Sequence, residues 1–163
     1  MAAVKSESVN QNSTDLDSTT QLENDNQPKY KSQFDWQVRV YYEDTDSGGV
    51  VYHSNYLKYM ERARTEWLRD LGFEQTDLKE KLNVLFVVHS MQIQFKKPAK
   101  FNDLLTISSE LTTIGFGSIV FLQKIHLNTQ TLIEASLKIA CINALSFKPS
   151  EIPNQLKQTL QQL

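Results

Sequence analysis

The sequence predicts an α+β domain in which a five-stranded antiparallel sheet wraps around one long central helix. Two observations support this class. Five runs alternate apolar and polar residues with the period of a strand, and one longer run has the period of a helix. The helical run follows the first strand-like run and precedes the other four. One helix against one sheet gives a two-layer domain, and the sheet must curl to cover the helix on its own.

Length and composition fit one folded domain between two tails. The chain has 163 residues, and 40% of them are hydrophobic. We expect a disordered polar tail at 1–33, the folded domain at 34–150 and a C-terminal tail at 151–163. Residues 1–33 are rich in Ser, Asn, Gln, Thr and Asp and have no hydrophobic periodicity. A formal net charge of −2 provides no basic field for nucleic acid.

The first strand and the helix are the best-defined elements. The strand starts at Phe34 and continues to Tyr42 with period-two alternation. The helix is expected over 54–71, with Ser54 or Asn55 as N-cap and Gly72 as the residue that ends it. Its apolar face recurs at steps of three and four: Tyr56, Met60, Ala63, Trp67 and Leu71.

The rest of the chain predicts a short polar connection and four strands. A helical turn is expected within 74–82, followed by strands at 84–95, 105–111, 119–127 and 132–147. The last strand places Ile133, Ala135, Leu137, Ile139 and Cys141 on one face. Consecutive strands with short connections are expected to form antiparallel hairpins. The final residues predict at most a weak helix.

The segment from Glu43 to Gly49, between the first strand and the helix, is the candidate active site. It contains three acids and two adjacent glycines, and His53 follows it. Taken alone, such an acid-glycine loop is more often ordinary turn chemistry. Its position favours function, because unpaired amides and a partial positive charge gather at a helix N-terminus. A carboxylate there can act as base or nucleophile, while the amides stabilise a developing oxyanion.

Other catalytic signatures are absent from the sequence. The segment Gly115–Ile119 is not a nucleophile elbow, because its serine follows the second glycine. We expect Cys141 to pack in the core, and His89 and His126 lack the spacing of a metal site. There is no phosphate-binding loop or dinucleotide fingerprint. We therefore expect no metal and no cofactor.

Two continuous segments resemble a known family. Val38–Tyr56 and Glu61–Glu66 are similar to the YbgC branch of the 4-hydroxybenzoyl-CoA thioesterase family, and Lys97–Ala99 and Asn102–Leu105 extend the likeness. The resemblance covers about residues 35–148. It implies the hotdog fold and acyl-CoA thioesterase activity. It also implies association with the Tol–Pal envelope system, and homodimers or homotetramers with active sites at the subunit interface.

The family pattern assigns roles to individual residues. The catalytic aspartate matches Asp46, and His53 matches the histidine typical of the YbgC branch, with a less certain role. Backbone amides from Gly49 to Tyr52 match the group that polarises the thioester carbonyl. The expected substrate-binding residues are Gly49, Val51, Tyr52, Asn55 and Lys97. Lys97 belongs to a basic cluster with Lys96 and Lys100 that either contacts CoA phosphates or is simply solvated.

Two further functions remain open at this stage. The first is a scaffold that binds acyl carrier protein or an acyl chain. The second is a dehydratase or hydratase that uses His53 as its acid/base residue. A thioesterase suits the residues, because a thiol with a pKa of roughly 8.5 leaves without a strong general acid. Without a membrane-length apolar run or signal peptide, we expect a cytoplasmic protein. The sequence leaves open the acyl type and whether Asp46 attacks the carbonyl or activates water.

Overall fold

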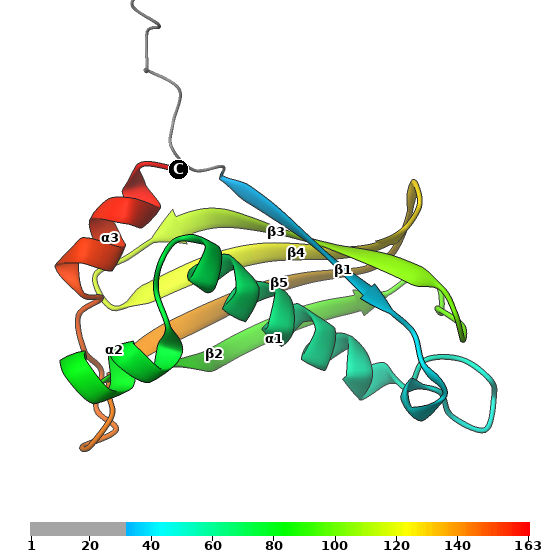
Figure 1. The fold of residues 1–163 in the computed structure, drawn as a ribbon, viewed down its shortest axis with the longest axis horizontal. Coiled ribbons are helices and arrows are strands. Elements are labelled where there is room, and N and C mark those ends of the chain that lie inside the picture. The colour runs from blue at the N-terminus through cyan, green and yellow to red at the C-terminus, as the bar shows by residue number, and fades with distance from the viewer. Residues whose placement is uncertain (1–31) are drawn as a thin grey trace, which may run out of the picture.

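The computed structural model describes residues 32–163, which form one five-stranded antiparallel sheet with a long helix across one face (Figure 1). The strand order is β1-β3-β4-β5-β2. The strands are β1 (Gln33–Arg39), β2 (Val84–Phe95), β3 (Leu104–Ile114), β4 (Ser118–Leu127) and β5 (Gln130–Asn143). The helices are η1 (Tyr42–Asp44), α1 (His53–Asp70), α2 (Gln75–Leu82) and α3 (Asn154–Gln161). The predicted fold class is confirmed, while the expected disordered tail lies, up to residue 31, outside the described residues.

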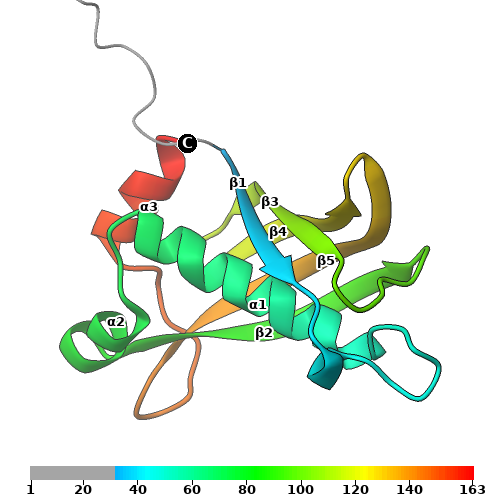
Figure 2. The same cartoon turned by 45° about the vertical axis from the view of Figure 1, so that its right-hand side comes forward.

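The core lies between α1 and the sheet. All five residues of the predicted helical face are buried, and so are the five on the predicted face of the last strand. In the turned view, α1 lies against one face of the sheet, with α2 and α3 near its C-terminal end (Figure 2). Gly72 ends the helix as predicted, because its φ of 87° is a backbone conformation that favours glycine.

Three predicted boundaries were wrong. The first strand ends at Arg39, because the Asp44 carboxylate accepts the amide of Tyr41 at 2.8 Å and closes the turn η1. Glu43 therefore lies in η1 and does not continue the strand. The last strand ends at Asn143, whose side-chain oxygen accepts the amides of Leu145 and Ser146 and starts a turn. The helix begins at His53 with Tyr52 as its N-cap, so neither expected residue caps it.

The connection after β2 is not a hairpin, contrary to the prediction. β2 pairs with β5 and β3 pairs with β4, so the segment 96–103 crosses between strands that are not neighbours. On its way it passes the start of α1, where the Val51 amide donates to the Ala99 carbonyl oxygen at 2.9 Å and Val50 forms a bridge with Lys100. This crossing brings the basic segment beside the loop that precedes α1.

The end of the chain packs onto the domain. Residues 151–163, expected as a tail with weak helix potential, contain α3. Ile152, Leu156 and Leu160 are buried in the core, because the helix turns one apolar stripe inward. The connection at 74–82 likewise forms a full helix, α2. No helix within residues 32–163 is long and apolar enough to cross a membrane.

Candidate active site

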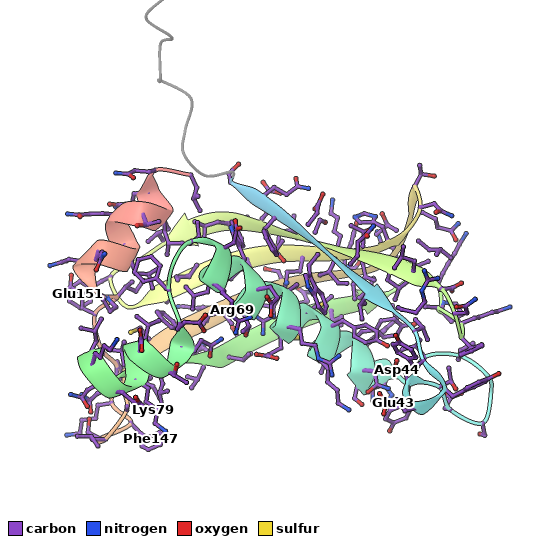
Figure 3. All side chains as sticks on the ribbon, viewed as in Figure 1. Glu43, Asp44, Arg69, Lys79, Phe147 and Glu151 are labelled. Carbon is purple, nitrogen blue, oxygen red and sulfur yellow. The ribbon has the colours of Figure 1, made fainter. Side chains whose placement is uncertain are left out.

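The loop between β1 and α1 lies at one end of the molecule. In Figure 3, Glu43 lies at the end opposite Lys79 and Glu151. The loop is closed by its own backbone: the Asp46 amide donates to the Val50 carbonyl oxygen at 2.9 Å. Its geometry is therefore defined by local hydrogen bonds before any substrate binds.

Asp46 has one carboxylate oxygen held by the loop. The Gly48 amide donates to Asp46 Oδ1 at 2.8 Å, and the other carboxylate oxygen accepts no hydrogen bond within residues 32–163. The Gly49 amide donates to the Asp46 carbonyl oxygen at 3.0 Å, and Gly49 has a φ of 73° that favours glycine. A Cβ atom on Gly48 would lie 3.1 Å from Asp46 Oδ1. The two glycines therefore permit both the turn and the position of the carboxylate.

One open groove brings most of the predicted site residues together. Asp46 and His53 both line it, and so do the predicted contacts Val51, Tyr52 and Lys97. Its other walls are Val50, Tyr56, Phe95, Lys96, Pro98 and Ile133. The His53 ring contacts Tyr52, with 4.3 Å between ring centroids, and meets Phe95 edge-on at 6.4 Å. The groove is thus an aromatic cleft with one carboxylate and one imidazole.

The amides of the loop divide into engaged and unengaged groups. Those of Gly49, Val51 and Tyr52 all donate to carbonyl oxygens of the chain itself. The amides of His53 and Ser54, in the first turn of α1, have no acceptor in the described part of the chain. They are the donors that a helix start leaves unsatisfied, and they carry its partial positive charge.

Asn55 lies outside the groove. Its side chain is 6% exposed and donates from Nδ2 to the Asp44 carbonyl oxygen at 2.8 Å. The same oxygen accepts the Tyr52 amide at 2.9 Å. Asn55 therefore ties the loop to the helix, although the sequence pattern suggested a substrate contact.

Two buried tyrosines, Tyr56 and Tyr59, follow on α1, and the sequence pattern had placed Tyr56 on the apolar face of the helix. Tyr56 lines the groove, and its hydroxyl accepts the Ala99 amide at 2.9 Å. Burial raises the pKa of Tyr59, and the nearby Asp44 carboxylate raises it further, yet the Tyr59 hydroxyl makes no hydrogen bond of acceptable geometry. The spacing of Tyr56 three residues after His53 was the available signal, because it places both on one helical face.

Not every lysine of the cluster Lys96, Lys97 and Lys100 is available to bind an anion. Lys96 pairs with Glu134 at 2.6 Å, and this hydrogen bond lowers the pKa of Glu134. Lys97 lines the groove and has no ion pair within residues 32–163. Lys97 is therefore the cation best placed to meet an anionic group at the groove.

A second, apolar cavity lies beneath the C-terminal half of α1. Arg64 lines it and donates to Gln123 Oε1 at 2.6 Å. Burial lowers the pKa of Arg64 to about 10. Gln123 is fully buried and donates in turn to the Met60 carbonyl oxygen and the Ser109 hydroxyl. This network joins α1 to β3 and β4 through polar groups inside the core.

The fold and the matched sequence define a class of hydrolases: the chain belongs to the thioesterase superfamily, whose family model matches residues 48–134. Within that class its relatives include YbgC proteins, which confirms the resemblance seen in the sequence. The acyl-CoA thioesterase YbgC of Haemophilus influenzae is 43% identical over 130 residues, covering 80% of this chain and 96% of the relative.

Two further relatives agree. The acyl-CoA thioester hydrolase YbgC of Escherichia coli O6:H1 is 44% identical over 124 residues, covering 76% of this chain and 92% of the relative. The crystal structure of a probable thioesterase from Bartonella henselae is 40% identical and superposes with a TM-score of 0.72. That match covers 74% of this chain and 99% of the solved one.

Proposed function

We propose that the chain hydrolyses an acyl-CoA thioester to a free acid and CoA, with Asp46 as general base or nucleophile. The proposal rests on one groove that is lined by Asp46 and by His53, the first residue of α1. One oxygen of the Asp46 carboxylate accepts the Gly48 amide, and the other accepts no hydrogen bond within residues 32–163. The names of the YbgC relatives, which specify acyl-CoA thioesters, support the substrate class.

The chemistry needs few groups. The thioester carbonyl oxygen accepts hydrogen bonds from the unpaired amides of His53 and Ser54, which stabilise the oxyanion as attack proceeds. If Asp46 is the base, it takes a proton from water as the water oxygen bonds to the carbonyl carbon. The carbon–sulfur bond then breaks, and CoA leaves as a thiolate, which needs no strong acid. The His53 imidazole edges the same groove and would contact the reacting group.

The other predicted contacts have distinct roles in this proposal. Gly49 permits the turn, Val51 forms a buried wall and Tyr52 covers the groove. Lys97 would pair with a CoA phosphate, as a cation at the edge of the groove. The amides of Gly49, Val51 and Tyr52 are engaged, and within residues 32–163 those of Val50, His53 and Ser54 have no acceptor. We propose His53 and Ser54 as the oxyanion donors, because the helix start adds its partial positive charge.

The oligomeric state, the cellular location and an acyl carrier protein as the alternative partner are also proposals. A homodimer through β2, or a homotetramer, is supported by the free edge of β2, which exposes Val87, Val88 and Phe95. We propose a cytoplasmic enzyme associated with the Tol–Pal system, as the family resemblance implies. Acyl carrier protein is the alternative partner, with the domain as a scaffold of weak activity. Sedimentation tests the assembly, and binding of acyl carrier protein without turnover would favour the scaffold.

The test of the enzymatic proposal is a panel of aromatic, short and long acyl-CoAs. CoA release is measured for the wild type, Asp46→Asn and the matched control Glu43→Gln. Glu43 is an exposed acid in the same loop and lies outside the groove. We expect turnover of at least one class of acyl group, lost in Asp46→Asn and retained in Glu43→Gln. Unchanged turnover in folded Asp46→Asn would overturn the assignment.

A further inference from the structure

Tyr56 is a core residue that also lines the groove of Asp46 and His53. Its side chain is only 2% exposed, and its ring packs against Tyr59 and Phe95, with centroids 6.3 and 6.1 Å away. Yet it lines the groove together with Asp46 and His53. The ring is thus held by the core, while the residue also borders the groove that contains Asp46.

The hydroxyl is oriented by the segment that crosses behind the groove. Its oxygen accepts the Ala99 amide at 2.9 Å, while the Ala99 carbonyl oxygen accepts the Val51 amide at 2.9 Å. The hydroxyl proton has no acceptor within residues 32–163. Because the oxygen is occupied on its protein side, the proton is left to point toward a group in the groove.

Two carboxylates, those of Asp103 and Asp46, act on the Tyr56 hydroxyl, and Asp46 is the one that lines the groove. Burial raises the pKa of Tyr56, and the carboxylates of Asp103 and Asp46 raise it further, so the hydroxyl keeps its proton at neutral pH. The Tyr56 hydroxyl and the Asp46 carboxylate do not hydrogen-bond directly. A donor and an acceptor that face one groove without touching are suited to hold a small molecule between them.

We propose that Tyr56 is a catalytic residue that holds the attacking water against Asp46. The Tyr56 hydroxyl donates to the water oxygen, and the water donates one hydrogen to the free oxygen of Asp46. The inference rests on the proposed thioester hydrolysis and adds the residue that orients the water.

The bonds of this step balance. Asp46 takes the proton that the water donates to it, and the water oxygen bonds to the acyl carbon. The carbon–sulfur bond breaks, and its electron pair leaves with CoA. Tyr56 keeps its own proton throughout and serves only as a donor. If Asp46 instead attacks the acyl carbon first, CoA leaves as a thiolate and an anhydride forms. The water held by Tyr56 then bonds to the acyl carbon, the acyl carbon–oxygen bond to Asp46 breaks, and the released Asp46 carboxylate takes the proton of the water.

Tyr59 provides the matched control. It lies one turn further along α1, is 1% exposed and has a hydroxyl without a hydrogen-bond partner within residues 32–163. Tyr59→Phe therefore removes the same atom from the same helix without touching the groove. Tyr56→Phe also leaves the Ala99 amide without its acceptor, which lowers the stability of the fold. For that reason the test compares two reactions of the same variant.

The experiment measures hydrolysis of an acyl-CoA and its reaction with added hydroxylamine, after subtraction of the enzyme-free rate. Hydroxylamine attacks through its own nitrogen and forms a hydroxamate, so it does not need the oriented water. We expect Tyr56→Phe to lower kcat for hydrolysis by about 10-fold to 100-fold, with KM within about twofold. Hydroxamate formation should stay within about threefold of the wild type, and Tyr59→Phe should change neither reaction.

Each other result overturns the inference. Wild-type hydrolysis by Tyr56→Phe would show that the water is held elsewhere. Equal losses of hydrolysis and hydroxamate formation would reduce Tyr56 to a structural role. Failure of the proposed function looks different, because the wild type itself would then release no CoA from any acyl-CoA.

Discussion

Replacing Asn55 by alanine tests whether this side chain holds the loop before α1 in place or binds substrate. The substitution removes one neutral hydrogen bond of 2.8 Å from a side chain that is 6% exposed. The Asp44 carbonyl oxygen keeps the Tyr52 amide as a second donor, so no buried group is orphaned. A lost neutral hydrogen bond costs about 1 kcal/mol, and the small void adds to it. We expect a total loss of about 1–2 kcal/mol.

The assay combines thermal unfolding with steady-state kinetics of CoA release. For a domain of this size the loss corresponds to a fall in Tm of roughly 3–6 °C. Because Asn55 ties down the loop that positions Asp46, we expect kcat to fall while KM changes little. The matched control is Asn154→Ala, an exposed asparagine at the start of α3. An unchanged Tm with a raised KM would refute this reasoning and return Asn55 to the substrate contacts.

Five further measurements test separate parts of the structure. Gly48→Ala should lower kcat at least severalfold with little change in Tm, because its Cβ would lie 3.1 Å from the Asp46 carboxylate oxygen that we propose takes part in catalysis. Gly117→Ala should lower the free energy of unfolding in urea by about 1–3 kcal/mol, because its Cβ would meet a backbone oxygen at 2.5 Å. Arg64→Met should cost about 1–3 kcal/mol in the same urea titration, because it leaves a fully buried amide oxygen without its donor. Burial raises the pKa of Cys141 from 9.0 to about 11, so native protein should resist iodoacetamide at pH 8. The same shift means that the stability of the wild type relative to Cys141→Ala is fully present below pH 9 and declines as the pH rises from 9 to 11.

The elements that depend on local pattern were predictable. The apolar stripe of α1 needs only residues three and four apart, and the buried face of β5 needs only every second residue. The end of α1 at Gly72 follows from one residue's backbone freedom. In each case the information lies within a few residues of the feature itself.

What failed depends on segments far apart in the sequence. No local pattern states that β2 pairs with β5, so the crossing of 96–103 and its approach to the active-site loop were missed. The same limit affects single side chains. The periodicity counts Tyr56 as core and cannot show where its hydroxyl ends, and it cannot show that Asn55 turns back to Asp44.

The central claim is that Asp46 carries the chemistry of thioester hydrolysis. The most direct measurement is the initial rate of CoA release by Asp46→Asn, on the best acyl-CoA of the panel, beside the wild type and Glu43→Gln. Circular dichroism must show the same fold in all three proteins. The structure predicts a loss of about 100-fold or more in kcat for Asp46→Asn and none in Glu43→Gln. A folded Asp46→Asn variant with kcat within about twofold of the wild type would contradict the claim.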